Sequence, residues 1–315
     1  MSDRLPSLKD LGSGAAARLA LGRALLDQGN YTEAARRAEA ALVLDPRLPQ
    51  AHLLLGRIRT AQGEYGAAVE HYRAALQGDP TLAWVHLMLA NVFTELGQVG
   101  EALQECGEAI RKQPGLALAH LTLANLRFEQ GEQDEAAVSY REAVRLNPQF
   151  AMARYRLGVI ASQQGDRETA IAECRAALRL QPHMATARLT LGDLLAECRE
   201  YDAALEEYRA AVRISPAMGI AYYKAGNLYF EQGLHVEAMQ EYRIALAQEI
   251  EVAACHHQIG RIHAAQGRLR DAIAEFQAAL AQDPDLVPAW NDLAVANAAV
   301  ERLQRDQQAA DRDVS

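Results

Sequence analysis

Aromatic residues, cysteines and long apolar runs are scarce in this chain of 315 residues. Phe, Trp and Tyr make up only 6% although half of the residues are hydrophobic, so alanine supplies much of the apolar content. That composition suits closely packed helices better than β-sandwich cores. The four cysteines form no CxxC pair, which is typical of a reducing compartment, and no apolar run is long enough for a signal peptide or a membrane span. We therefore expect a cytoplasmic protein without membrane insertion.

An excess of positive charge is also lacking, since 41 acidic residues outnumber 32 Lys and Arg and the formal net charge is −9. This argues against general nucleic-acid binding, which needs concentrated Lys and Arg. The sequence has no nucleophile–base arrangement and no Gly-Lys-Ser/Thr phosphate loop, so we expect neither an enzyme nor a cofactor. The densest group of metal-ligand residues is Cys255, His256, His257 and His263, but His256 and His263 are about 10 Å apart along one helix. We interpret this group as packing residues rather than as a metal site.

A small residue recurs every 34 positions without insertion, at Gly22, Gly56, Ala90, Ala124, Gly158, Gly192, Gly226, Gly260 and Ala294. A period of this length is typical of a solenoid built from one supersecondary element per repeat. In most units a glycine predicts a turn between two helices, and a later proline predicts the end of the second helix. The sequence therefore predicts an all-α solenoid with repeats at 15–48, 49–82, 83–116, 117–150, 151–184, 185–218, 219–252 and 253–286, and a capping helix at 287–304. We expect residues 1–14 to form a partial cap and residues 305–315 a disordered tail.

Two units depart from the pattern. Arg199 stands where the other units have their turn glycine, so the sixth turn is expected to form at a backbone cost or with another geometry. Ile250 replaces the proline of the seventh unit, and we expect a longer helix or an altered superhelical pitch at this junction.

The second helix of each unit has two alanine rows with a larger residue between them in most units, at Ala38, Tyr72, Cys106, Tyr140, Cys174, Tyr208, Tyr242 and Phe276. With Leu-Gly in the first helix and the closing proline, this order resembles the tetratricopeptide repeat from residue 15 to about residue 304. The family's early tryptophan is kept only as Trp290. His52, His86 and His120 hold that position in three units and are expected to pack within their helix pairs. The resemblance implies a right-handed superhelix of antiparallel helix pairs whose first helices line a concave groove.

The groove positions implied by the resemblance vary between units and contain aromatic, asparagine and acidic side chains. The candidate partner-binding residues are Arg57, Trp84, Leu87, Asn91, Leu121, Asn125, Phe128, Glu129, Tyr155, Asp193, Glu197, Tyr223, Asn227, Phe230 and Glu231. Aromatic anchors with asparagines between them suit an extended or helical peptide, because an asparagine can bond backbone C=O and N–H groups whatever their sequence. In the alternative interpretation, the leucines pack between helices and the acids keep a solvated face soluble.

The asparagine row resembles the rows in peptide-binding repeat arrays of O-linked glycosyltransferases, although the companion asparagine three residues earlier is replaced, for example by Met88 and Thr122. The lysines with which a related subfamily grips chaperone C-termini are absent, which argues against that partner. Asp193, Glu197 and Glu231 are predicted to form a shallow acidic pocket for a partner's Lys or Arg.

The sequence therefore predicts a non-enzymatic scaffold that binds a protein or peptide partner in its groove. Two alternatives stay open. The chain can be a regulatory or substrate-recruiting subunit of an enzyme or assembly complex, or it can associate with itself as a homo-oligomer.

Overall fold

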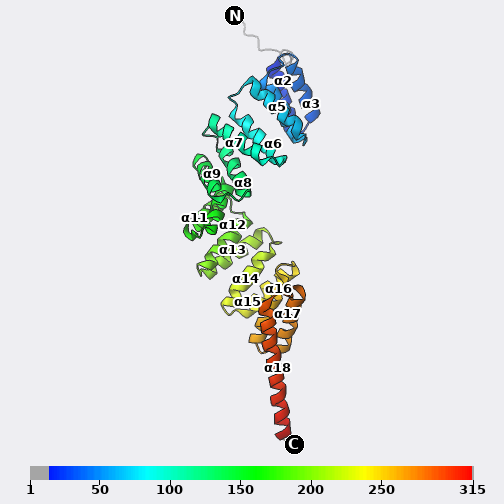
Figure 1. Ribbon diagram of the computed structural model, residues 1–315, viewed down its shortest axis with the longest axis vertical. Helices are drawn as coiled ribbons and strands as arrows, with labels where there is room; N and C mark the ends of the chain where they lie inside the picture. Colours follow the sequence, from blue (N-terminus) through cyan, green and yellow to red (C-terminus); the bar gives the residue numbers. More distant parts are fainter. Residues whose placement is uncertain (1–13, 314–315) are drawn as a thin grey trace. The chain divides into compact units, whose positions relative to one another are not determined.

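The computed structural model describes residues 14–313, with side chains up to residue 308. Within this range the chain forms seventeen α-helices and no strand, as the repeat period predicts (Figure 1). The helices form eight consecutive pairs and a final single helix. Most of the predicted N-terminal cap lies outside the described residues. The chain divides into two compact units, one ending at Ile160 and the other beginning at Ala161, and each is described by itself.

The first unit contains four complete helix pairs and the start of a fifth. Its helices are α2 (Ala15–Asp27), α3 (Tyr31–Leu42), α4 (Pro49–Ala61), α5 (Tyr65–Gly78), α6 (Ala83–Glu95), α7 (Val99–Lys112), α8 (Ala117–Glu129), α9 (Gln133–Leu146) and the first part of α10 (Ala151–Gln163). The two helices of each complete pair pack together, the second helix of one pair packs on the first helix of the next, and α6 also contacts α8. First helices are therefore neighbours within this unit.

The second unit repeats the same order and ends in the single helix. Its elements are the end of α10, α11 (Arg167–Leu180), α12 (Ala185–Glu197), α13 (Tyr201–Ile214), α14 (Gly219–Glu231), α15 (His235–Ala247), α16 (Val252–Ala265), α17 (Leu269–Gln282) and α18 (Val287–Asp313). The final helix packs on both α17 and α16, so it covers the last complete pair.

The turn between the helices of a pair is made in the left-handed backbone region. The seven turn glycines have φ between 70° and 80°, where a residue without a Cβ pays little steric cost. Arg199 adopts the same conformation with φ of 62°. The backbone cost predicted for the sixth turn is thus confirmed, and it amounts to about 1–2 kcal/mol for a residue with a Cβ.

Alanines build the core of each pair, and in five pairs one aromatic side chain of the second helix packs between them. All sixteen alanines of the two second-helix rows have no exposed surface, which lets neighbouring helices approach closely. Tyr72 lies against Gly56, where an added Cβ would be 2.5 Å from the tyrosine ring. The same close approach recurs at Gly192, Gly226 and Gly260. The small residue of the 34-residue period therefore makes room for the aromatic ring of the second helix.

The seventh junction is irregular on both sides: α16, which follows it, has 14 residues, one more than the first helices before it, whereas α15 is shortened. Helix α15 has 13 residues, one fewer than α13 or α17, and the chain turns through Glu249 and Glu251 with φ of 57° and 47°. Ile250 lies against the backbone of Gly219, where a Cβ would be 2.5 Å from Ile250 Cγ1. Without the proline that fixes φ in other units, two glutamates take up left-handed conformations to make the connection.

The C-terminal end also differs from the sequence-based expectation. Helix α18 does not end near residue 304 but continues to Asp313, so most of the predicted disordered tail is helical; Figure 1 shows it extending past α17. After Pro288 this helix contains neither glycine nor proline and is rich in Ala, Gln and Arg, which are good helix formers. Arg305 also pairs with Glu301 one turn earlier, at 3.9 Å. Among the described residues, no helix is both long and apolar enough to cross a membrane.

Candidate functional site

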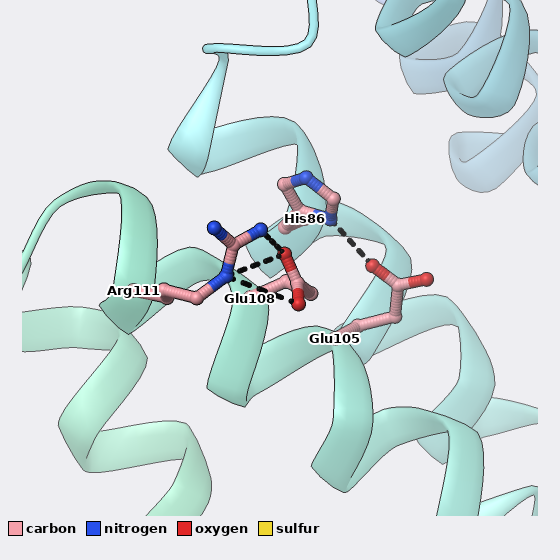
Figure 2. Close-up of polar contacts among 4 residues, drawn as sticks. All are labelled: His86, Glu105, Glu108 and Arg111. Carbon is pink, nitrogen blue, oxygen red and sulfur yellow. Dashed lines mark hydrogen bonds and ion pairs between the residues drawn. The ribbon is translucent and has the colours of Figure 1, made fainter.

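The residues at the family's tryptophan position tie each first helix to the chain around it. His120 Nε2 and Trp290 Nε1 lie 3.0 and 2.9 Å from the carbonyl oxygens of Pro114 and Pro284. In the third repeat, His86 Nδ1 is 2.6 Å from Glu105 Oε2 on the second helix, as Figure 2 shows. The predicted packing within a helix pair is confirmed for His86, whereas His120 bonds the carbonyl that closes the preceding repeat.

The histidines near residue 256 are likewise held by carboxylates. His256 Nδ1 lies 2.6 Å from Glu275 Oε2, and His257 Nε2 lies 2.8 Å from Asp292 Oδ2 on α18. His263 is buried, and desolvation lowers its pKa. The described part of the chain holds no group of three or more metal-ligating side chains.

Tyrosine hydroxyls from the second helices reach the asparagine row of the first helices. Tyr140 donates to Asn125 Oδ1 at 2.7 Å, and Tyr242 donates to Asn227 Oδ1 at 2.8 Å. In both pairs the two residues are fifteen positions apart in one repeat. Because Oδ1 accepts the tyrosine proton, the Nδ2 group is the part of each carboxamide left to donate to another molecule. Burial raises the pKa of Tyr140 to about 12, so its hydroxyl stays a donor at neutral pH.

Asn91 occupies the same helix position without such a partner. The residue fifteen positions later is Cys106, which is buried, and among the described residues no side chain is hydrogen-bonded to the exposed Asn91. Burial raises the pKa of the Cys106 thiol to about 12. The carboxamide of Asn91 can therefore present either its oxygen or its nitrogen to a ligand.

Three apolar side chains form a stripe near the starts of the first helices in the third to fifth repeats. They are Trp84 on α6, Leu118 on α8 and Met152 on α10. Leu118 is 51% exposed and Met152 48% exposed, while Trp84 is half-buried. We call this set the apolar stripe. Leu118 was not among the residues singled out from the sequence, although it lies exactly one period from Trp84.

Two of the predicted aromatic anchors are covered on one face by arginine. The guanidinium carbon of Arg156 lies 4.5 Å from the ring centre of Phe128, and that of Arg261 lies 4.6 Å from the ring centre of Phe230. Such stacking is favourable by about 0.5–1 kcal/mol at exposed sites. The two phenylalanines thus present a positively charged surface rather than a bare ring.

The remaining predicted anchors are partly used by the fold. Tyr223 packs on Tyr242 with ring centres 6.1 Å apart, and Tyr155 is half-buried. Leu87 is only 4% exposed and packs with Ala109 and Ala119, so its side chain belongs to the core. Leu121 is half-buried against the core of the fourth repeat. Leucine at this position packs between helices, as the alternative interpretation proposed.

The predicted acidic pocket is largely neutralised by the chain itself. Asp193 accepts from Tyr208 at 2.8 Å and lies 3.0 Å from Lys224 Nζ. Glu197 lies 2.9 Å from Arg167 Nε. Of the three carboxylates of that pocket, only the exposed Glu231 has no cationic partner among the described residues.

Two further predicted residues, Arg57 and Glu129, are exposed on first helices of the first unit. Arg57 is exposed and lies 3.9 Å from Asp27, a distance at which an exposed ion pair contributes little. Glu129 is exposed at the end of α8. Within the first unit, the apolar stripe, Asn91 and Asn125 are carried by the first helices of successive repeats.

Models of the tetratricopeptide repeat match nearly the whole helical part of the chain. One matches at residues 19–83, 121–185, 155–219 and 189–250, a second at 59–126 and a third at 253–286. No curated protein matches the chain.

Solved structures with the same fold share few identical residues with this chain. The structure of pilF from Pseudomonas aeruginosa is 22% identical, with a TM-score of 0.59, over 64% of this chain and 92% of that one. YrrB, described as a TPR protein with an unusual peptide-binding site, is 20% identical with a TM-score of 0.55, over 59% of this chain and 96% of that one. A tetratricopeptide repeat protein from Parabacteroides merdae is 20% identical with a TM-score of 0.53, over 79% and 98% of the two chains. These likenesses concern the fold.

Proposed function

The chain belongs to the tetratricopeptide repeat family, and we propose that this protein-interaction scaffold binds a segment of a partner protein on the first helices of its third to fifth repeats. The observation that carries the proposal is the apolar stripe, in which Leu118 and Met152 are about half exposed and Trp84 is half-buried, with the exposed Asn91 and Asn125 two turns further along α6 and α8. Exposed apolar side chains that lie together on an otherwise polar surface are typical of protein-binding sites.

The chemistry of this surface favours a peptide backbone with apolar side chains. The stripe offers anchoring contacts about one repeat apart, which suits a partner with several spaced apolar residues. Asn125 has its Nδ2 group free to donate to a backbone carbonyl, because its oxygen is held by Tyr140. Asn91 can accept or donate. Such contacts do not depend on the partner's sequence, so the stripe would supply the selectivity.

The scaffold acts without chemistry of its own in this proposal. The family is generally a non-catalytic interaction repeat. Cys106, Cys174 and Cys255 are buried thiols whose pKa burial raises to about 12, which makes them poor nucleophiles.

Peptide selection on the full chain tests the proposal. Phage-displayed random peptides would be selected on the wild-type protein and then measured on a Leu118→Ala/Met152→Ala variant. We expect the double variant to lose about tenfold or more in affinity, because anchor side chains at an interface typically contribute 1 kcal/mol or more each.

The matched control is Val138→Ala, which removes an equally exposed apolar side chain (61% exposed) from the second helix α9. It should leave peptide affinity unchanged. If selected peptides bound the double variant and the wild type equally, the stripe would not be the binding surface. Light scattering of the unliganded chain would show whether the stripe instead serves self-association.

A further inference from the structure

Two imidazole rings meet inside the second repeat. His52 on α4 and His71 on α5 have their Nδ1 atoms 3.3 Å apart, with ring centres separated by 5.6 Å. The corresponding pairs of the third and eighth repeats join a histidine to a carboxylate, His86 to Glu105 and His256 to Glu275. Of these three repeats, only the second repeat has another imidazole, His71, in place of the glutamate.

The tautomer of His52 is set by its second nitrogen. His52 Nε2 lies 3.1 Å from the carbonyl oxygen of Pro46, so it must carry a proton to donate there. In the neutral ring Nδ1 then has a free lone pair directed at His71. A histidine that donates one ring N–H to a backbone carbonyl while the other nitrogen faces a ligand has the usual arrangement of a metal-bound imidazole.

The separation of the two nitrogens matches tetrahedral coordination. Two imidazole nitrogens bound at about 2.05 Å to one tetrahedral ion lie about 3.3 Å apart. We propose that His52 and His71 form a two-histidine site for a divalent ion of the zinc class, with water in the remaining positions and the ion joining α4 to α5. On binding, the proton that His71 Nδ1 shares with His52 moves to His71 Nε2, so both Nδ1 lone pairs face the ion. This inference is independent of the proposed partner-binding surface.

The surroundings keep the site neutral and reachable. Burial and the neighbouring His52 lower the pKa of His71, with a smaller contribution from Arg59, while Glu70 and Glu39 act in the opposite direction. The lower pKa favours the neutral imidazole, which is the form that binds a metal ion. His52, though not His71, also lines a hollow of about 300 Å³ with Pro46, Arg47, Ala74, Gln77 and Gly78, so an ion would approach from the His52 side. With two protein ligands, the ion should bind more weakly than in a structural site with four.

Calorimetric titration of the full chain with zinc chloride at neutral pH tests the site. We expect one ion per chain, a higher melting temperature with zinc, and a loss of about tenfold or more in affinity in His52→Gln and in His71→Gln. His86→Gln is the matched control, because His86 holds the same helix position beside a carboxylate. It should leave zinc affinity unchanged.

Ring-nitrogen NMR spectra of the histidines give a second readout that does not depend on the variants folding. Zinc should shift the Nδ1 resonances of His52 and His71 before those of any other histidine. Absence of binding, equal affinity in His71→Gln and the wild type, or first shifts at another histidine would each overturn the proposal.

Discussion

The third and fourth repeats place an asparagine at the same point of their first helices, yet the two side chains differ in freedom. Asn125 accepts a hydrogen bond from the hydroxyl of Tyr140. In the repeat of Asn91, the residue at the position of Tyr140 is Cys106, which is too short to reach the asparagine. The atoms that a first-helix asparagine can offer to a ligand therefore depend on the second-helix side chain behind it as well as on the asparagine itself. A second-helix tyrosine both fills the core and fixes the carboxamide in front of it.

The largest expected effect on stability comes from removing the second-helix side chain that lies behind each asparagine. Tyr140→Ala should cost about 3–5 kcal/mol, because a completely buried aromatic ring leaves a cavity that the alanine-lined seam cannot fill. Cys106→Ala should cost only about 1 kcal/mol, since it deletes a single heavy atom. Urea unfolding combined with amide hydrogen exchange of α6 to α9 would measure both. Equal losses in the two repeats would contradict the comparison.

A smaller effect is expected from the asparagines themselves. Asn125→Ala leaves the buried Tyr140 hydroxyl without its acceptor and should destabilise by about 1–2 kcal/mol. Asn91→Ala breaks no hydrogen bond within the described residues and, because alanine favours helix, should be neutral or slightly stabilising. Thermal denaturation of the two variants gives the readout. A similar loss in Asn91→Ala would show that it, too, serves the fold.

The smallest expected effect is a difference in how much folding stability Cys106 and Tyr140 each lose at alkaline pH. Both groups have a folded pKa of about 12, above the ordinary 9 of the thiol and 10 of the phenol, so the folded state holds the proton more tightly. The stability each contributes is present below its ordinary pKa and is lost as the pH rises toward 12. At pH 10 the loss is about 1 kcal/mol for Cys106 and a few tenths for Tyr140. Cys106→Ala should therefore flatten the alkaline stability profile more than Tyr140→Phe, and the opposite order would refute the assignment.

The repeat architecture could be predicted from sequence because its signals are local. The turn glycines, the closing prolines and the buried alanines each act within one helix or one turn, and even Arg199 takes the left-handed conformation that its position demands. The C-terminal helix is longer than the charge alternation of the last residues predicts, because that stretch contains neither glycine nor proline to end it. At Ile250 the missing proline correctly marked an irregular junction, but not its form.

The candidate site was harder to predict because it depends on contacts between helices. The sequence predicts Leu87 as a groove residue, but the side chain is buried beside Ala109. It predicts Asp193 as an available carboxylate, but Asp193 accepts a hydrogen bond from Tyr208 and forms an ion pair with Lys224. The spacing of fifteen residues between Asn125 and Tyr140, which recurs between Asn227 and Tyr242, is visible in the sequence and could predict these hydrogen bonds. The approach of His71 to His52, nineteen residues apart, required the geometry of the helix pair.

The irregular junction at Glu249 and Glu251 weakens the coupling between the seventh and eighth repeats during unfolding. In a linear array, each repeat is coupled only to its neighbours, so cooperativity passes along the chain one interface at a time. Two left-handed glutamates at a single joint subtract about 1–2 kcal/mol each from the coupling there. Under heat or mechanical tension, the last complete pair and its capping helix α18 therefore form a block that can part from the seventh repeat while each block keeps its own structure.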